Sequence, residues 1–457
     1  MGVVTATSPA AALPLVSGKA IATDLLAAPD MWGHLRRGFA MPALDHELVS
    51  AHARRFAANG FFTARADRVR LYLPLMIEEL EQRKLPLELA MLPMVESALN
   101  PQARSPVGAT GLWQFMAPTA KRFELRSSRL VDDRKNLREA TRAAMDYLST
   151  LHAQFGDWHL AMAAYNWGEG SVARTIARQR AKGLPTDFAA LAPLMPAETR
   201  NYVPQIMALA QLVANPQAMG ARLPDMPDGN PLVEVELTRD IDLKLAVQMA
   251  GISEKDFLAL NAAVKPPLVL AKATPRLLLP LDAGMRLDSA LAKHTGKTAS
   301  WSVHKLDRTQ PLEAIAARWG VSQQALREAN SIPRGMKPMA GSAMLLPVAA
   351  PAGSQVSAEL VASASLQTTP DIVKVYTTAR AGETLASVAK RTGVDVARLA
   401  QWNDIPLKRA KQKLKTGKAL ALWVQREHAS AYSNAPPSVA TSPIAPRSPV
   451  KTRVPLA

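Results

Sequence analysis

The sequence predicts a chain of several domains, in which an all-α domain is followed by small α+β modules. Its 457 residues are enough for roughly two to four domains. Apolar residues recur at helical spacing in the N-terminal half, for example at Ala144, Tyr147, Leu148 and Leu151, and again from Leu160 to Ala164. A segment of the C-terminal half recurs after 73 residues, and such an offset is typical of a repeated small module.

The most informative segment of the helical part is residues 85–114, in which the apolar run Leu92–Val95 leads directly to Glu96. A helix over residues 86–98 would place this carboxyl group at its C-terminal end. Apolar surroundings and the negative end of a helix dipole both favour the protonated acid. Polysaccharide cleavage needs a carboxyl group that stays protonated near neutral pH. Glu96 is therefore our candidate catalytic acid, although a single glutamate at a helix end is more commonly a surface residue.

Three further segments bring polar side chains close to expected helix ends. Residues 105–109 form a Ser-Pro-Val-Gly-Ala turn, and residues 111–114 read Gly-Leu-Trp-Gln. Residues 164–168, Ala-Tyr-Asn-Trp-Gly, lie where glycines end a helix. A last helix is expected to begin near residue 198 and to reach about Ala214. Each tyrosine or asparagine alone would be an ordinary core or capping residue, so the set of motifs carries the functional prediction.

Together these motifs resemble the catalytic domain of the lytic transglycosylases of the soluble-Slt type, which share a lysozyme-like fold. They occur in the family's order, and the resemblance covers about residues 30–215. It implies an all-α, lysozyme-like catalytic domain. It also implies cleavage of the β-1,4 bond between N-acetylmuramic acid and N-acetylglucosamine in peptidoglycan, with neither a cofactor nor a metal ion.

The resemblance also implies a role for each candidate residue. Glu96 would protonate the bridging oxygen and then accept the proton of the muramic C6 hydroxyl as a 1,6-anhydro ring closes. Ser105 and Gln114 would hold saccharide groups near the cleavage point. Tyr165 and Asn166 would orient Glu96 or the muramic N-acetyl group. The candidate substrate-binding residues are Ser105, Gln114, Tyr165, Asn166 and Tyr202.

Two alternatives remain open at this point. A lysozyme-type muramidase would use water and a second carboxylate, and spacing alone leaves Glu198 and Asp132 open for that role. Only the transglycosylase would produce anhydro ends. A wall-binding scaffold with an inactive catalytic domain is the other alternative, and the presence of Glu96 with all its companion motifs argues against it.

The C-terminal repeat predicts small modules of the order strand, helix, helix, strand. The segment 312–321 recurs as 385–394, and expected strands frame each copy. Both copies resemble LysM modules, which bind glycans that contain N-acetylglucosamine. We call residues 301–347 the middle module and residues 373–424 the C-terminal module. An upstream module over residues 231–285 is a weaker copy, expected to be a degenerate LysM-like scaffold.

The three modules differ in the turn that precedes their first helix. The C-terminal module has Gly382-Glu383-Thr384-Leu385, close to the family's Gly-Asp-Thr-Leu, whereas the middle module has Thr309-Gln310-Pro311-Leu312. Glycan binding is therefore predicted for the C-terminal module and left open for the middle one. Linkers are expected at residues 215–230 and 348–372, and a disordered tail at residues 429–457.

Composition and charge narrow the compartment and the partners. The chain has no cysteine, so it has neither disulfides nor a cysteine for lipidation, and this composition suits the periplasm or cell envelope. Residues 1–29 are expected to be disordered or the remnant of an export signal, because no basic residue precedes their apolar stretch, as a complete signal peptide would require. The net charge of +17 calls for an anionic partner. No nucleic-acid-binding motif is present, and the carboxylates of peptidoglycan fit this charge.

Overall fold

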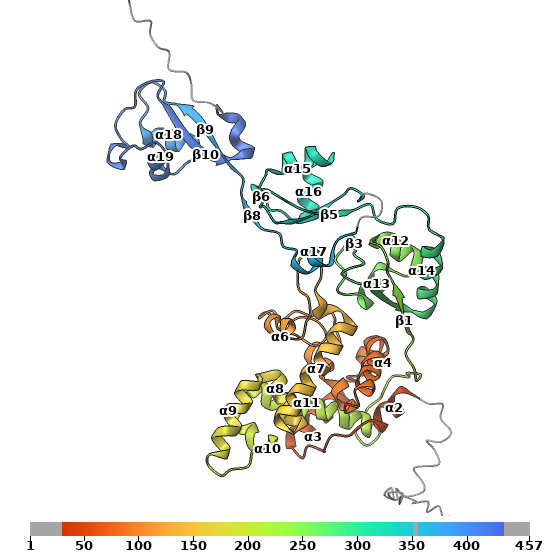
Figure 1. Cartoon of the computed structure of the whole chain (residues 1–457). Coiled ribbons are helices and arrows are strands. Elements are labelled where there is room, and N and C mark those ends of the chain that lie inside the picture. Colours follow the sequence, from red (N-terminus) through yellow and green to blue (C-terminus); the bar gives the residue numbers. More distant parts are fainter. Residues whose placement is uncertain (1–29, 351–354, 434–457) are drawn as a thin grey trace, which may run out of the picture. The chain divides into compact units, whose positions relative to one another are not determined.

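The computed structural model describes residues 30–350 and 355–433 (Figure 1). The chain forms two compact units, Met1–Val303 with Val348–Ser365 and His304–Pro347 with Leu366–Ala457. The predictions for residues 1–29 and 434–457 lie outside the described residues. No helix within the described ranges has both the length and the apolar character that crossing a membrane requires.

The first unit starts with a helical domain, and residues 30–215 contain no named strand among the described residues. Its α-helices are α2 (Met31–Arg37), α3 (Glu47–Ala58), α4 (Ala66–Gln82), α5 (Leu92–Ser97), α6 (Ala117–Arg122), α7 (Leu137–Phe155), α8 (Trp158–Trp167), α9 (Glu169–Arg180), α10 (Phe188–Leu191) and α11 (Ala197–Ala214). Short 3₁₀ helices are η1 (Thr63–Arg65), η2 (Leu87–Met91), η3 (Asp133–Lys135) and η4 (Ala192–Leu194). The last helix ends where the sequence predicted.

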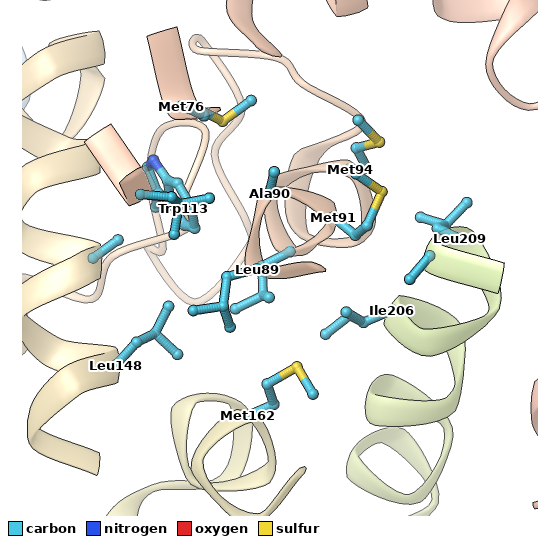
Figure 2. Close-up of a cluster of buried hydrophobic side chains, with 14 of the residues drawn as sticks. Met76, Leu89, Ala90, Met91, Met94, Trp113, Leu148, Met162, Ile206 and Leu209 are labelled. Atoms are coloured by element: carbon cyan, nitrogen blue, oxygen red, sulfur yellow. The ribbon is translucent and has the colours of Figure 1, made fainter. Parts of the chain in front are cut away.

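The segment η2–α5 lies inside this domain, surrounded by the longer helices. Leu89, Ala90 and Met91 expose none of their surface. Figure 2 shows side chains from four other helices around them: Met76 (α4), Leu148 (α7), Met162 (α8), and Ile206 and Leu209 (α11). Burial of so much apolar surface fixes the short helix α5, which could not persist alone in water.

The predicted continuous helix over residues 86–98 is interrupted. Residues Leu87–Met91 form a 3₁₀ turn, and α5 begins at Leu92 with Pro93 in its first turn. Proline lacks an N–H group and is favoured at this position, so it starts a new helix here. Ala98 ends α5 in the left-handed conformation, with φ of 51°. Glu96 therefore lies in the last turn of α5, as the prediction required.

The upstream module belongs to the first unit. Its elements are β1 (Leu232–Glu236), β2 (Ile241–Asp242), α12 (Leu243–Ala250), α13 (Glu254–Leu260), β3 (Leu268–Val269), β4 (Arg276–Pro280) and α14 (Leu281–Lys293). Strand β1 pairs antiparallel with β4. The predicted boundary at residue 285 falls inside α14, and Gly284 of this helix lies directly against Val233 of β1. The module therefore includes all of α14, which the strand–helix–helix–strand repeat did not contain.

The second unit holds the other two modules. The middle module has β5 (Ser302–Lys305), α15 (Leu312–Trp319), α16 (Gln323–Asn330), β6 (Met336–Pro338) and β7 (Ala343–Leu346). The C-terminal module has β9 (Ile372–Thr378), α18 (Leu385–Thr392), α19 (Val396–Trp402), η5 (Leu407–Arg409), β10 (Ala419–Gln425) and η6 (Arg426–Ala431). Strand β5 pairs with β7, and β9 pairs antiparallel with β10. The predicted fold class, a helical domain followed by small α+β modules, is confirmed.

One asparagine at the end of the second helix closes each module in the same way. Its side-chain amide donates to a carbonyl of the closing strand and accepts the N–H of the same residue, at 2.7–2.9 Å. The pairs are Asn261 with Leu278, Asn330 with Leu345, and Asn403 with Ala421. This shared contact gives a physical reason for the asparagine in the repeat, because it pairs strand groups that would otherwise be buried without partners.

Two segments predicted as linkers are partly built into the domains. Residues 215–230 pack on the helical domain, where Met226 is buried and its carbonyl accepts the N–H of Met31. Residues 348–372 contain α17 (Ala358–Ser363) and β8 (Thr368–Pro370), which pairs with β6. Residues 429–433, predicted to belong to a disordered tail, are also ordered, because Ser433 and Tyr376 exchange two backbone hydrogen bonds. These polar, Pro- and Ser-rich stretches are ordered by main-chain pairing, which composition does not reveal.

Candidate active site

The site is centred on the Glu96 carboxyl group, and α11 supplies its partner. The hydroxyl of Tyr202 donates a hydrogen bond to Glu96 Oε1 at 2.5 Å. Tyr202 lies in the first half of α11 and is only 4% exposed, so its hydroxyl has few other orientations. The contact joins residues 106 positions apart and places two of the candidate site residues together.

The surroundings of Glu96 favour its protonated form. Its pKa is raised from an ordinary value of 4.5 to about 7, mainly because burial disfavours the charged carboxylate. The hydrogen bond from Tyr202 acts in the opposite direction, and the nearby Glu198 carboxylate adds to the increase. Near neutral pH the group is thus poised between acid and base.

The loop of residues 111–114 is bonded to helices on both sides of the site. Ser97 Oγ, next to Glu96, donates to the Leu112 carbonyl at 2.9 Å. The Tyr165 hydroxyl of α8 donates to the Trp113 carbonyl at 2.7 Å. These two bonds fix α5 and α8 against the same loop. Ser97 is therefore a helix-end hydrogen-bonding residue, and Tyr165 acts on the loop backbone.

Trp113 belongs to the core and not to a sugar-binding surface. Its ring is completely buried, and its indole N–H donates to Thr141 Oγ1 at 3.0 Å. A tryptophan at this position could stack on a sugar ring or pack in the core, and the structure shows packing. Its burial fixes the position of the loop 111–114.

The loop depends on the absence of a side chain at Gly111. This residue has φ of +87°, and a Cβ atom there would lie 1.8 Å from the carbonyl oxygen of Arg134. Replacing Gly111 with alanine is expected to lower the free energy of unfolding by about 2–4 kcal/mol, through backbone strain and the clash together. Urea unfolding followed by tryptophan fluorescence would measure this loss.

Gly108→Ala is the matched control for the Gly111 substitution. Gly108 has a similar φ of +93°, but a Cβ atom there would meet nothing within 4 Å. Its loss of stability is expected to be about 1 kcal/mol, because it carries the backbone strain alone. Equal losses in the two variants would contradict the role of the Arg134 contact.

Asn166 faces the start of α11 rather than Glu96 directly. Its Oδ1 accepts the Thr199 hydroxyl at 2.7 Å, and its Nδ2 lies 3.4 Å from Glu198 Oε1. Asn166 thus holds Glu198, whose charge in turn reaches Glu96. The predicted role of Asn166 in orienting Glu96 can act only indirectly through these contacts.

Ser105 and Gln114 hold their own loops. Ser105 Oγ accepts the backbone N–H of Ala109 at 3.0 Å, and Gln114 Nε2 donates to the Gly111 carbonyl at 2.7 Å. Neither side chain is hydrogen-bonded to Glu96 in the described part of the chain. Both are partly exposed. The structure therefore brings Tyr202 to the acid but leaves Ser105 and Gln114 as candidate saccharide contacts.

The two candidate second carboxylates differ in their availability. Asp132 forms a two-pronged ion pair with Arg134, with both N–O distances at 2.9 Å. Glu198 is exposed and close enough to Glu96 to raise its pKa. Only Glu198 therefore remains a candidate for a second catalytic carboxylate.

The aromatic surroundings of Tyr165 were not apparent from the sequence. The Tyr147 ring lies 5.3 Å from the Tyr165 ring, and the Phe115 ring lies 6.3 Å away. Burial raises the pKa of Tyr147 to about 12 and that of Tyr165 well above its usual value. The helical spacing identified Tyr147 only as an apolar position, because periodicity does not show which side of a helix reaches a site.

Replacing Tyr202 with phenylalanine should shift the basic limb of the pH–rate profile to higher pH. In the wild type the hydrogen bond from Tyr202 lowers the pKa of Glu96. Its loss raises this pKa, so the carboxyl group keeps its proton to higher pH. Turnover should fall about tenfold, because the proton-accepting form of Glu96 is no longer stabilised. A pH–rate profile on soluble glycan strands would measure both effects. Tyr147→Phe is the control and should leave the limb in place; an unchanged limb in Tyr202→Phe would contradict the contact.

Comparisons with known proteins identify two kinds of domain in this chain. Residues 75–187 match the model of the Transglycosylase SLT domain. Residues 312–347 and 377–422 match the model of the LysM domain. In the middle module the match begins only after the divergent turn, as the sequence suggested.

Two relatives and one solved structure illustrate the similarity. The chain is 30% identical over 429 residues to membrane-bound lytic murein transglycosylase D of Escherichia coli (strain K12), over 90% of this chain and 88% of that one. It is 34% identical over 122 residues to the soluble lytic murein transglycosylase of the same strain, over 25% of this chain and 18% of that one. The crystal structure of the 70 kDa soluble lytic transglycosylase from Escherichia coli is 30% identical over 30% of this chain and 22% of that chain, with a TM-score of 0.25. The near-complete match, with the helical catalytic domain and the LysM modules in the same chain, shows that this protein belongs to the family of membrane-bound lytic murein transglycosylase D.

Proposed function

We propose that the protein is a peptidoglycan lytic transglycosylase that cleaves the β-1,4 bond between N-acetylmuramic acid and N-acetylglucosamine. The observation that supports this most directly is the carboxyl group of Glu96, which has a pKa of about 7 and accepts a hydrogen bond from Tyr202. Near neutral pH such a group can both donate and accept a proton. A transglycosylase needs one carboxyl group in both of these roles.

The first step is proton donation. Protonated Glu96 transfers its proton to the oxygen that bridges the two sugars, and the bond between this oxygen and the muramic C1 breaks. The N-acetylglucosamine side leaves with a new hydroxyl group, and C1 acquires oxocarbenium character. The buried carboxyl group of Glu96 supplies the proton because its acid form is populated near neutral pH.

The second step is proton acceptance. Ionised Glu96 removes the proton of the muramic C6 hydroxyl, and this oxygen bonds to C1 to close the 1,6-anhydro ring. The acid is restored, and no water enters the product. The Tyr202 hydroxyl stabilises the ionised form of Glu96 between the two steps, since it donates a hydrogen bond to Oε1.

The remaining site residues position the substrate. Ser105 and Gln114 hold saccharide groups from the loops beside α5. Tyr165 supports the loop 111–114 through the Trp113 carbonyl, and Asn166 orients Glu198 or the muramic N-acetyl group. The polar side chains stand on segments that are fixed by burial or by backbone hydrogen bonds, which favours a preorganised site.

The LysM modules retain the enzyme on its polymer in the cell envelope. The C-terminal module binds glycan segments that contain N-acetylglucosamine, and its Gly382–Leu385 turn has the family's pattern with Glu in place of Asp. A module attached to the same chain raises the local concentration of substrate at the catalytic domain. Because peptidoglycan lies in the periplasm, we expect the enzyme to act there.

A lysozyme-type muramidase is the second candidate, because Glu198 lies close enough to Glu96 to influence it. The experiment that tests the proposal is mass spectrometry of the fragments released from purified sacculi. Fragments with 1,6-anhydro ends, lighter by one water than hydrolysis products, are expected. Release of reducing muramic ends alone would overturn the proposal in favour of the muramidase.

A further inference from the structure

The C-terminal module carries a strongly basic loop that the proposed catalytic function does not use. The loop covers residues 407–418, between α19 and β10, and contains no acidic residue. Its six cationic side chains are Lys408, Arg409, Lys411, Lys413, Lys415 and Lys418. We call this segment the basic loop. All six side chains are exposed.

Backbone hydrogen bonds fix the basic loop beside the turn that carries the LysM resemblance. The Leu414 N–H donates to the Glu383 carbonyl at 2.8 Å, and the Gly417 N–H donates to the Ala379 carbonyl at 2.8 Å. Thr384 and Lys413 form a β-bridge. The basic loop is therefore a fixed border of the turn 382–385 and not a free flexible segment.

Two lysines of the basic loop, Lys413 and Lys415, face the solvent. Leu414 is partly buried in the module's core. Lys413 and Lys415, on either side of it, are exposed and so lie on the solvent side. The loop therefore holds these two ammonium groups out beside the proposed glycan-binding turn.

The positive charge of the basic loop is not balanced by neighbouring acids. Glu383, the acid of the adjacent turn, is already paired with Arg391 at 2.8 Å. None of the six cations forms an ion pair within the described residues. Like charges held together in this way repel one another and favour an anionic ligand.

The middle module lacks this feature. Its closing asparagine, Asn330, lies 15 positions before Leu345, the strand residue that it binds. In the C-terminal module the corresponding residues, Asn403 and Ala421, are 18 positions apart. The shorter segment carries two cations, and one of them, Lys337, is paired with Asp371 at 3.3 Å. Of these two modules, the C-terminal one therefore has the longer and more basic loop.

We propose that the basic loop binds the carboxylates of peptides attached to the glycan strand that the adjacent turn holds. N-acetylated sugars are neutral, so a cationic border next to a sugar-binding turn adds nothing for naked glycan. Peptidoglycan carries its carboxylates on peptides that branch from every muramic residue, within reach of long lysine side chains. The C-terminal module thereby prefers peptide-bearing strands to stripped ones. This inference rests on the proposed glycan binding of that module.

The experiment measures binding of the full chain, with Glu96→Gln added to every form so that the ligands are not cleaved. The ligands are soluble strands with their native peptides, the same strands after amidation of the peptide carboxylates, and strands stripped of peptides. The test variant replaces Lys411, Lys413 and Lys415 with glutamine. The control variant replaces three exposed lysines of the upstream module with glutamine, namely Lys244, Lys255 and Lys293. It therefore has the same net charge as the test variant.

The parent and control forms should bind native strands about tenfold more tightly than amidated or stripped strands, and added salt should remove this difference. The test variant should bind all three ligands with the affinity that the parent has for stripped strands. Equal binding of native and amidated strands by the parent form would overturn the inference. So would an equal loss of binding in test and control variants, which would indicate net charge alone.

Two other outcomes distinguish peptide binding by the basic loop from glycan binding by the module and from binding to a lipid surface. Failure of the parent form to bind stripped strands would overturn glycan binding itself, not only the role of charge. Binding to vesicles of anionic phospholipid that is lost in the test variant, without any preference for native over amidated strands, would overturn the inference in favour of a membrane surface.

Discussion

Replacing Glu96 with glutamine is expected to lower the rate of glycan-strand cleavage by about 10³-fold or more. General acid–base groups commonly contribute about 10²–10⁴-fold, and here a single group serves both proton transfers. The amide is nearly isosteric with the protonated acid and can still accept the Tyr202 hydrogen bond, but it can neither give nor take the catalytic proton. Turnover of soluble strands, measured by chromatography of the released fragments, would show the loss.

The control for this substitution is Glu47→Gln, on the exposed side of α3. It removes the same charge from the helical domain without touching the site and should leave turnover unchanged. Retention on sacculi should be the same in both variants, because the modules are intact. Wild-type-like turnover by Glu96→Gln would show that another group is the acid.

The same substitution has a second, pH-dependent effect on stability. The raised pKa of Glu96 means that the folded state holds its proton more tightly than the unfolded chain does. Wild-type stability therefore falls as the pH rises from about 4.5 to about 7, and the penalty persists at higher pH. Glutamine pays no such penalty, so the variant should be more stable than wild type at pH 8 by about 1–3 kcal/mol, and no more stable at pH 4.

The chemistry of the site could be predicted from the sequence further than its supporting structure. Glu96 was identifiable because an apolar run leads to it, and the same apolar residues produce the burial that raises its pKa. Tyr202 entered only through the family motif. Its contact with Glu96 spans 106 positions and depends on how α11 packs against α5, which no local pattern encodes.

The roles of Ser105, Gln114 and Asn166 illustrate the opposite limit. Residue type and motif order marked all three as polar contacts, but hydrogen bonds within their own loops, or to Thr199 and Glu198, now occupy them. Their saccharide contacts stay predictions. A sequence lists polar groups without showing which ones the backbone already uses, and this distinction decides whether a side chain faces a ligand.

The modules show why repeats are easier to predict than their borders. The asparagine that closes each module recurs because the hydrogen bonds it makes to the closing strand are the same each time. Helix α14 and strand β8 lie outside the repeat, and each is ordered by contacts specific to one module. Composition therefore predicted linkers and boundaries where main-chain pairing continues the fold.

The second large effect is expected in digests of sacculi made in ¹⁸O-labelled water, where the new muramic ends should carry no label. If the C6 hydroxyl is the nucleophile, every atom of the anhydro end comes from the substrate. A hydrolase would insert one labelled oxygen at C1 and would produce ends that borohydride reduces. Mass spectrometry before and after reduction distinguishes the two products, because the anhydro ends resist reduction.

Whether the new muramic ends carry the ¹⁸O label tests the role of Glu198. A water-using mechanism needs a second carboxylate that activates water or attacks C1 itself, and Glu198 is the available candidate because Asp132 is held by Arg134. If Glu198 only tunes the acid, Glu198→Gln should still produce unlabelled ends. The basic limb of its pH–rate profile should then move to lower pH, since removing the nearby negative charge lowers the pKa of Glu96. Labelled, reducible ends from the wild type that disappear in Glu198→Gln would instead establish the muramidase mechanism, with Glu198 as its second carboxylate.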